Sequence, residues 1–131
     1  MISYRSSLFA LIASVALLGS PPASAAEWQP YSASAFAAAQ KEGKSILIDI
    51  FAPWCPVCRA QAPILEKLTA DPQFKSLIVF KVDFDNLTSD VRALKANQQS
   101  TLITYKGETE KGRSVGDTNE ASIAALLQGA L

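Results

Sequence analysis

The stretch SILIDIFAPWCPVC, residues 45–58, decides the fold because it leads a buried strand directly into a helix that begins with two cysteines. Residues 45–52 are too uniformly apolar for a strand with one face in water, so they predict a central strand covered on both faces. Residues 55–69 combine good helix formers with apolar side chains at helical spacing, and Pro63 predicts a kink inside that helix. The two cysteines therefore lie where a central strand ends and a helix begins.

Helices and strands alternate on either side of this segment. We expect three further strands and three further helices, the strands over 77–84, 101–105 and 113–115, and the helices over 34–42, 89–96 and 117–127. Strands that are joined through helices run parallel, whereas the closing hairpin must be antiparallel. The sequence therefore predicts an α/β fold with a mixed parallel and antiparallel central sheet and helices on both faces.

Capping signals define where the predicted helices begin. Ser32 or Ser34 is expected to cap the first helix, and Thr88 or Ser89 the third. Asp117-Thr-Asn-Glu120 fits a capping box, with Asp in place of Ser or Thr, that opens the last helix.

The first 25 residues predict a secretory signal peptide that is cleaved. They combine Arg5, an apolar run over 8–18 and the small-residue end Ala23-Ser-Ala25. The alternatives are a membrane anchor or an ordinary buried helix, but the run is shorter than the roughly 20 residues that a bilayer requires. We therefore expect one mature domain over 26–131, exported to a bacterial periplasm, where disulfides form and persist.

The composition limits the chemistry that this chain can perform. Its 12 basic and 12 acidic side chains balance, which argues against binding to nucleic acid. It has no histidine, which excludes Ser-His and Cys-His catalysis and nearly every catalytic zinc site. Two cysteines and one methionine are too few for a site that binds soft metals. Catalysis must therefore use cysteine, carboxylate, lysine or tyrosine, and we expect no metal and no cofactor.

The Cys55-Pro56-Val57-Cys58 motif is the candidate redox centre. Unpaired backbone N–H groups at a helix start favour a thiolate, so Cys55 is the predicted nucleophile. Cys58 lies one turn further into the helix and is expected to be more buried, which makes it the predicted resolving thiol. A structural disulfide is the alternative, although so small a ring constrains the unfolded chain little.

Residues 48–55, Ile-Asp-Ile-Phe-Ala-Pro-Trp-Cys, together with Pro63 in the following helix, resemble the active-site region of the thioredoxin family. The resemblance covers essentially the whole mature chain and implies a thioredoxin fold and thiol–disulfide exchange with disulfide-containing protein substrates. It also implies that Asp49 accepts the proton of the resolving thiol and that Lys81 is its basic neighbour on the adjacent strand. The residues agree, because single charged side chains in apolar strands are costly unless paired. Alternatively, one of the two points to solvent at a strand end.

The chain departs from the family pattern at Ser100, which stands where the family has a cis-proline that faces the active site. A cis bond without proline costs roughly 3 kcal/mol, which favours a trans peptide here. The family uses this loop to bind an extended substrate through its backbone. We hypothesise that the Ser100 hydroxyl donates to the thiolate instead. The residues expected to contact substrate are Trp54, Pro56, Gln99, Ser100 and Thr101.

These features predict an exported thiol–disulfide oxidoreductase, a monomer that acts as a reductase or electron carrier in redox homeostasis. The dipeptide between the cysteines lacks the histidine with which strongly oxidising relatives stabilise their thiolate. Residues 71–74, Asp-Pro-Gln-Phe, resemble periplasmic thioredoxin-like domains that a membrane thiol–disulfide transporter reduces, which suggests such a donor and a role in cytochrome c maturation. The alternatives are a non-catalytic thioredoxin-like binding module and an exported copper-handling protein that uses Cys55 and Cys58.

Overall fold

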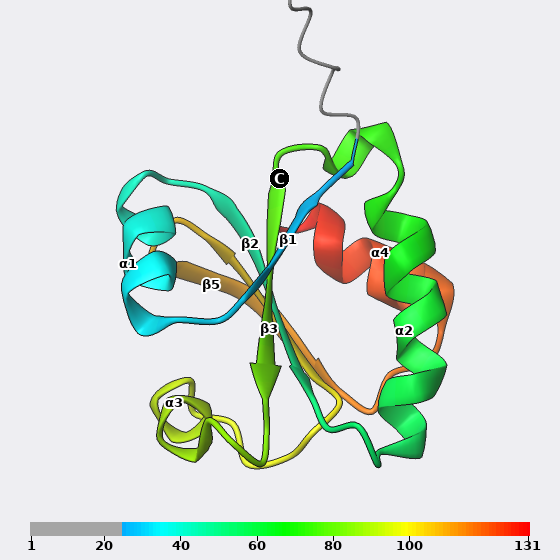
Figure 1. The fold of residues 1–131 in the computed structure, drawn as a ribbon. Coiled ribbons are helices and arrows are strands. Elements are labelled where there is room, and N and C mark those ends of the chain that lie inside the picture. The colour runs from blue at the N-terminus through cyan, green and yellow to red at the C-terminus, as the bar shows by residue number, and fades with distance from the viewer. Residues whose placement is uncertain (1–24) are drawn as a thin grey trace, which may run out of the picture.

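The computed structural model describes residues 25–131 and contains one five-stranded sheet with helices on both faces (Figure 1). The strand order is β1-β3-β2-β4-β5, in which β1, β3 and β2 are parallel and β4 and β5 are antiparallel. The mixed sheet that the sequence predicts is confirmed. The predicted signal peptide lies outside the described residues, except for Ala25. Within residues 25–131, no helix is long and apolar enough to cross a membrane.

The elements follow one another along the chain in the expected alternation. They are β1 (Glu27–Pro30), α1 (Ala33–Lys41), β2 (Ser45–Phe51), α2 (Pro56–Thr69), the 3-10 turn η1 (Pro72–Phe74), β3 (Leu77–Asp83), α3 (Thr88–Ala93), β4 (Thr101–Lys106), β5 (Thr109–Val115) and α4 (Glu120–Gln128). The closing hairpin is longer than predicted, because β5 begins at Thr109 and not at residue 113.

β1 is the strand that the sequence did not predict. It is four residues long, ends in Pro30 and lies at the edge of the sheet beside β3. Proline is tolerated at such an edge because it needs no partner for a backbone N–H there. Trp28 fixes the strand further, because its Nε1 donates to Thr69 Oγ1 on α2 at 3.1 Å. Tertiary contacts, rather than strand propensity, define β1.

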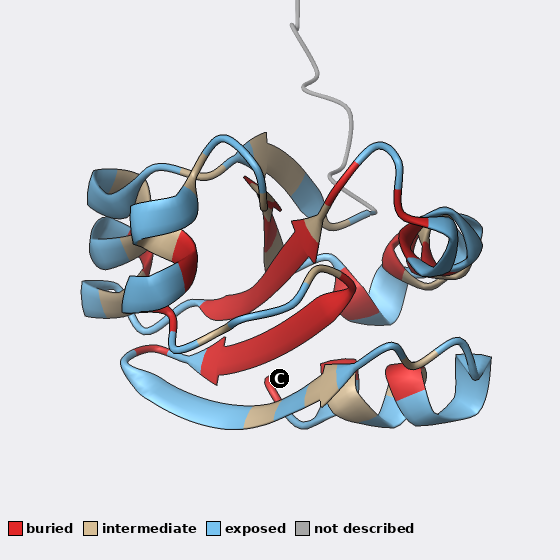
Figure 2. Cartoon of the chain, turned by 90° about the horizontal axis from the view of Figure 1, so that it is seen from below, coloured by how far each residue is buried: buried red, intermediate tan, exposed pale blue. Residues whose placement is uncertain are grey.

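β2 separates two hydrophobic cores, as its uniformly apolar sequence predicts. Ile46, Ile48 and Ile50 face α1 and α3 in one core, whereas Leu47 faces α2 and α4 in the other. Figure 2 shows this arrangement, with the buried positions on the central strands and on the inner sides of the helices. The strand is therefore held from both sides, and it holds the start of the active-site segment in place.

The helix caps agree with the sequence only in part. Ser32 caps α1, because its Oγ accepts from the Ala35 N–H at 3.2 Å, as predicted. The prediction for α3 was wrong, since Leu87 occupies the cap position and no side chain caps that helix. The capping box of α4 was also misplaced: Asn119 is the cap, while the Asp117 carboxylate accepts from the Asn119 N–H at 2.9 Å.

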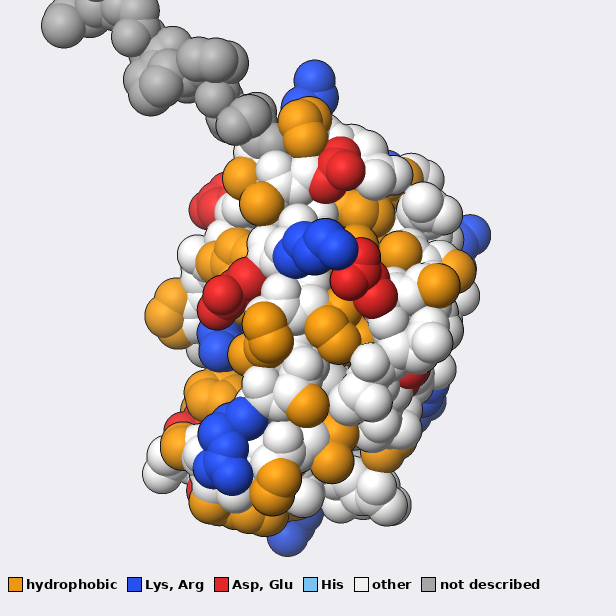
Figure 3. Space-filling view, turned by 90° about the vertical axis from the view of Figure 1, so that its right-hand side faces the viewer, with side chains coloured by type: hydrophobic (Ala, Val, Ile, Leu, Met, Phe, Trp, Pro, Cys, Tyr) orange, Lys and Arg blue, Asp and Glu red, His pale blue; other side chains and the backbone are white. Residues whose placement is uncertain are grey.

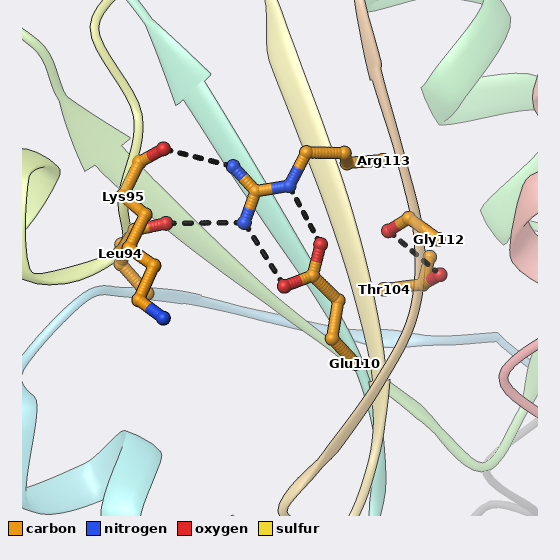
Figure 4. Close-up of polar contacts among 6 residues, drawn as sticks. All are labelled: Leu94, Lys95, Thr104, Glu110, Gly112 and Arg113. Atoms are coloured by element: carbon orange, nitrogen blue, oxygen red, sulfur yellow. Dashed lines mark hydrogen bonds and ion pairs between the residues drawn. The ribbon is translucent and has the colours of Figure 1, made fainter.

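Arg113 on β5 fixes the C-terminal end of α3 (Figure 4). Its guanidinium donates to the carbonyl oxygens of Lys95 at 3.0 Å and Leu94 at 3.2 Å, and it pairs with Glu110 at 2.6 Å. A cation that binds the last carbonyl groups of a helix satisfies acceptors that lack helical partners. The chain therefore enters the loop before β4 from a fixed point.

The face that carries α2 and α4 has no single sign of charge, since acidic, basic and apolar side chains are interspersed on it (Figure 3). Lys67 on α2 pairs with Glu120 on α4 at 2.7 Å across this face. Both side chains are exposed, so the pair contributes little to stability. The helices are held mainly by the core beneath them.

Candidate active site

Cys55 is the N-cap residue of α2. Its backbone is extended, and its Sγ accepts a hydrogen bond from the Cys58 N–H at 3.1 Å. An oxygen of Ser, Asp or Asn normally occupies this position, where it satisfies one of the unpaired amides of the first turn. Pro56 follows at the first helical position, where no N–H is needed. A sulfur placed in this way is favoured as an anion.

The two thiols differ in acidity. Burial acts to raise the pKa of Cys55, but hydrogen bonds from Cys58, the Ser100 hydroxyl and the Val57 amide outweigh it and hold that pKa below its ordinary value. Burial and the hydrogen bond with Cys55 raise the pKa of Cys58. At neutral pH, Cys55 is therefore the better thiolate and Cys58 the thiol that keeps its proton, as the predicted roles require.

Both thiols are buried, so exposure does not separate Cys58 from Cys55 in the way that the sequence predicts. Cys55 is 1% exposed and Cys58 is 8% exposed. As an N-cap, the Cys55 side chain folds back over the first turn of α2, and it packs with Ala52 and Cys58 against Phe51 and Phe84. The difference in reactivity between the two thiols arises from the helix terminus and the hydrogen bonds, not from exposure.

Exposed apolar side chains flank the nucleophile. Trp54 is 55% exposed and Val57 is 37% exposed, and Pro56 between them is also exposed. The Trp54 indole donates to Asp85 Oδ2 at 2.7 Å, which links the site to the turn after β3. The structure thus places Trp54 and Pro56 beside Cys55 with their side chains exposed. Asp85 was not predicted, although the ends of neighbouring parallel strands meet at one edge of a sheet.

Asp49 is buried in the middle of β2, 6% exposed, and is the register partner of Lys81 on β3. Burial raises its pKa to about 6, and the positive charge of Lys81 lowers it only in part. The Lys81 ammonium lies 4.2 Å from the centre of the Phe51 ring, and the ion pairs among residues 25–131 do not include an Asp49–Lys81 pair. Asp49 is therefore a carboxyl group that exchanges its proton near neutral pH.

Asp49 and Cys58 share one cavity. Its volume is about 120 Å³, and it is lined by both residues together with Phe51, Ala52, Pro53, Arg59, Ala62 and Lys81. A cavity of this size has room for water, and Asp49, Arg59 and Lys81 give it polar partners. A proton can thus pass between the resolving thiol and the carboxylate by way of solvent, which is the role predicted for Asp49.

Ser100 contacts both cysteines. Its φ is +55°, in the left-handed region, and the peptide bonds of the described residues are all trans. The Ser100 hydroxyl donates to Gln99 O at 2.6 Å. The same hydroxyl lies close enough to Cys55 to lower the pKa of that thiol, and the Ser100 N–H close enough to Cys58 to act in the same direction there. A hydroxyl proton rotates to suit its partners, so ionisation of Cys55 draws it to the sulfur.

The rest of the predicted substrate loop is less accessible than expected. The Thr101 side chain is 2% exposed and its Oγ1 donates to Gln98 O at 2.7 Å, so it serves the loop itself. The Ser100 carbonyl accepts from the Gly116 N–H at 2.9 Å. Gln99 is the one of the three predicted residues whose side chain is partly exposed. Of the three residues, Gln99 is thus the one whose side chain a substrate could reach.

Gln61 is a site residue that sequence reasoning missed. It lies on α2, is 1% exposed, and its Nε2 donates to Asp117 O at 2.7 Å and to Ser100 O at 3.4 Å. The side-chain oxygen is buried without a partner, an arrangement that costs about 1–3 kcal/mol. The available signal was its spacing: three residues after Cys58 and four before Leu65, Gln61 shares the inner face of the helix.

No group of three or more His, Cys, Asp or Glu side chains within residues 25–131 is arranged to hold a metal ion. The paired cysteines are both free thiols. Two free thiols in one CxxC motif are the groups that thiol chemistry requires.

Comparisons with known proteins give a consistent result. A family model described as Thioredoxin matches residues 28–129. A thioredoxin H-type of Brassica campestris is 35% identical over 91 residues, which cover 70% of this chain and 72% of that protein. Thioredoxin-2 of Saccharomyces cerevisiae is 36% identical over 97 residues, which cover 73% and 90%. The crystal structure of Trxlp from Edwardsiella tarda EIB202 is 40% identical with a TM-score of 0.75, and the match covers 77% of this chain and 98% of that one.

The raised pKa of Asp49 predicts how stability depends on pH. The folded state binds this proton more tightly than the unfolded chain does, so the stabilisation is complete below about pH 4 and is lost as pH rises through 6. Asp49→Asn should therefore be more stable than wild type at pH 7, by about 3 kcal/mol, and equally stable below pH 4. Urea unfolding across this pH range measures the difference.

Glu108→Gln is the matched control for Asp49→Asn, because it removes an exposed carboxylate from the β4–β5 turn. It should leave the pH profile of stability unchanged. An Asp49→Asn variant that follows the wild-type profile would show that this carboxyl ionises as freely as an exposed one.

The contact between Ser100 and Cys55 predicts that Ser100→Ala raises the pKa of Cys55 and slows its reaction at pH 7 with a small disulfide several-fold, because a donor to the thiolate is lost. Thiolate absorbance during a pH titration measures the pKa directly. Ser45→Ala, which removes a buried hydroxyl at the far end of β2, should not change it. If Ser100→Ala and Ser100→Pro both keep the wild-type titration and turnover, the hydroxyl does not bind the thiolate.

Proposed function

The chain belongs to the thioredoxin family and is a thiol–disulfide oxidoreductase, and we propose that it works as an exported reductase of protein disulfides. The observation that carries this proposal is the position of Cys55 as the N-cap of α2, with Cys58 one turn away. The family membership and the unequal thiols favour catalysis over a non-catalytic binding module. Both thiols are used in the reaction, so copper handling is not required to account for them.

The first step is attack by the Cys55 thiolate on one sulfur of a substrate disulfide. The substrate S–S bond breaks, a mixed disulfide forms on Cys55, and the departing substrate sulfur takes up a proton. Helix-terminal amides and the Ser100 hydroxyl hold the thiolate in place for this attack. Trp54 and Pro56 offer the apolar surface against which the substrate chain docks.

The second step is resolution by Cys58. Asp49 accepts the Cys58 proton through their shared cavity, and the Cys58 thiolate attacks the Cys55 sulfur. A Cys55–Cys58 disulfide forms, and the substrate leaves with both of its sulfurs reduced. Two electrons have passed from the protein to the substrate, so a dithiol donor must reduce the protein before the next cycle.

The direction and the location rest on separate features of the sequence. Pro56-Val57 offers no positive charge to the thiolate, which favours a reductase or electron carrier over a strong oxidant. Export to a periplasm rests on the pattern of Arg5, the apolar run over 8–18 and Ala23-Ser-Ala25. The segment 71–74 supports a membrane thiol–disulfide transporter as the donor, with cytochrome c maturation as one use of the electrons.

Reduction of insulin disulfides by the mature chain over 26–131 tests the chemistry. Cys55→Ser should abolish turnover, because no nucleophile remains for the first step. Cys58→Ser should abolish repeated turnover while a mixed disulfide on Cys55 accumulates, because the second step is lost. Glu108→Gln should react like wild type. Equal rates for wild type and Cys55→Ser would overturn the assignment of the nucleophile.

Expression of the full chain in a bacterium tests export and direction. The periplasmic fraction should contain a protein whose N-terminus is residue 26, and alkylation in intact cells should find Cys55 and Cys58 mostly reduced. The Cys58→Ser variant should capture a membrane protein through a mixed disulfide. An uncleaved chain in the cytoplasm would contradict export, and a fully oxidised pair in cells would contradict the reductase direction.

A further inference from the structure

Gln61 connects α2 to the loop before β4 and to the loop after β5. Its carboxamide nitrogen donates to the carbonyl oxygens of Asp117 at 2.7 Å and Ser100 at 3.4 Å. Both partners are acceptors, so the orientation of the amide is fixed with its NH₂ group toward the loops. The remaining oxygen is buried and unpartnered, a cost that an apolar side chain would avoid. The two donated bonds are therefore what this polar residue adds to the helix.

Ser100 is the residue in this loop that needs such support. A left-handed φ of +55° is unfavourable for a residue other than glycine and persists only where surrounding contacts hold it. In this conformation the Ser100 N–H lies near Cys58 and its hydroxyl near Cys55, where each favours the thiolate. Its carbonyl points the other way, toward the Gly116 N–H and Gln61. The bonds from Gly116 and Gln61 to the Ser100 carbonyl thus hold the Ser100 N–H and hydroxyl near the cysteines.

The other end of the loop is fixed independently. Arg113 binds the carbonyl oxygens of Leu94 and Lys95, and Thr101 Oγ1 binds Gln98 O (Figure 4). None of these contacts involves α2. Gln61 is the side chain of α2 that donates to a loop carbonyl, so it sets the position of Ser100 relative to the helix that carries both thiols.

We propose that Gln61 is a positioning residue for thiol–disulfide exchange, which binds the Ser100 and Asp117 carbonyls and so holds Ser100 in the left-handed conformation that presents its donors to Cys55 and Cys58. In this way a tertiary contact fixes the backbone at the position where the family has a cis-proline. The trans serine also keeps a backbone N–H near Cys58, which proline lacks, and this donor favours the Cys58 thiolate. The inference rests on the exchange activity and not on export or direction.

The variant Gln61→Leu tests this proposal, because leucine fills a similar volume without donating. The rate at which Cys58 resolves a mixed disulfide on Cys55 should fall by roughly fivefold to tenfold, the effect expected for loss of one hydrogen bond. Thiolate absorbance should show Cys55 titrating at higher pH. Gln61→Met, with a flexible side chain that packs in irregular space, should give the same result and excludes a packing artefact of leucine.

Thr69→Val is the matched control, since Thr69 is a buried polar residue on the same helix that bonds to Leu65 O and Trp28, away from the thiols. It should lower stability and leave the resolution rate and the titration unchanged. If Thr69→Val and Gln61→Leu slow resolution equally, or if both Gln61 variants behave like wild type while wild type reduces insulin, the positioning role is wrong. Absence of insulin reduction by wild type would instead refute the oxidoreductase function.

A double variant shows whether Gln61 acts through Ser100. Ser100→Pro removes the N–H and the hydroxyl and fixes φ near −65°, so the left-handed conformation is lost. In that background, Gln61→Leu should cause no further change in the resolution rate or in the titration of Cys55. A full and additive effect of Gln61→Leu in the Ser100→Pro background would show that Gln61 acts on the thiols by another route and would overturn the proposal.

Discussion

At the N-terminus of α2, backbone amides without helical partners point at the sulfur of Cys55, and the Cys58 amide donates to it at 3.1 Å. The helix needs an acceptor at this position, and an ionised sulfur is a stronger acceptor than a neutral one. The same contact therefore stabilises the helix and the nucleophile. When Cys55 and Cys58 form a disulfide, the negative cap disappears, so this contact favours the reduced form. Redox state and local stability are thus coupled through one hydrogen bond.

Burying an ionisable group lowers the stability of the folded state, and the rest of the fold must offset this loss. Asp49 sits in the central strand, where burial raises its pKa to about 6. A carboxylate in that place destabilises the fold at neutral pH, and the two cores on either side of β2 supply the compensating stabilisation. The benefit lies at the shared cavity, where Asp49 can take a proton from Cys58. A central strand with two packed faces is the part of this fold that tolerates such a group.

Sequence reasoning succeeded where local pattern and tertiary structure agree. The apolar run of β2, the helix after Cys55 and the alternation of elements follow from periodicity, and the structure contains all of them. β1 was missed because pairing with β3 and the Trp28–Thr69 bond define it, and neither is visible in four residues. The cap of α4 was misplaced because Asp117 and Asn119 both carry suitable oxygens, and only the folded chain shows which one the helix uses.

Some residues of the candidate site can likewise be predicted from local sequence, and others cannot. Cys55, Cys58 and Asp49 are recognisable from spacing and from charge in an apolar strand, whereas their relative burial depends on how the N-cap side chain folds back over its helix. Gln61 was missed because its partners lie 39 and 56 residues away in the chain. No local pattern reports contacts of that range.

Ser100 stands where the family has a proline, and the backbone conformation at this position can be fixed in two ways. A proline fixes φ within a single residue, so its effect does not depend on neighbours. A left-handed serine has no such internal restraint and relies on contacts from elsewhere. Its carbonyl accepts from the Gly116 N–H and from Gln61, while Arg113 and Thr101 bind carbonyl groups earlier in the loop. The contacts that fix Ser100 therefore come from β5, from α2 and from the loop itself. Serine also keeps a backbone N–H near Cys58, and this donor favours the thiolate at the point where the resolving thiol must lose its proton.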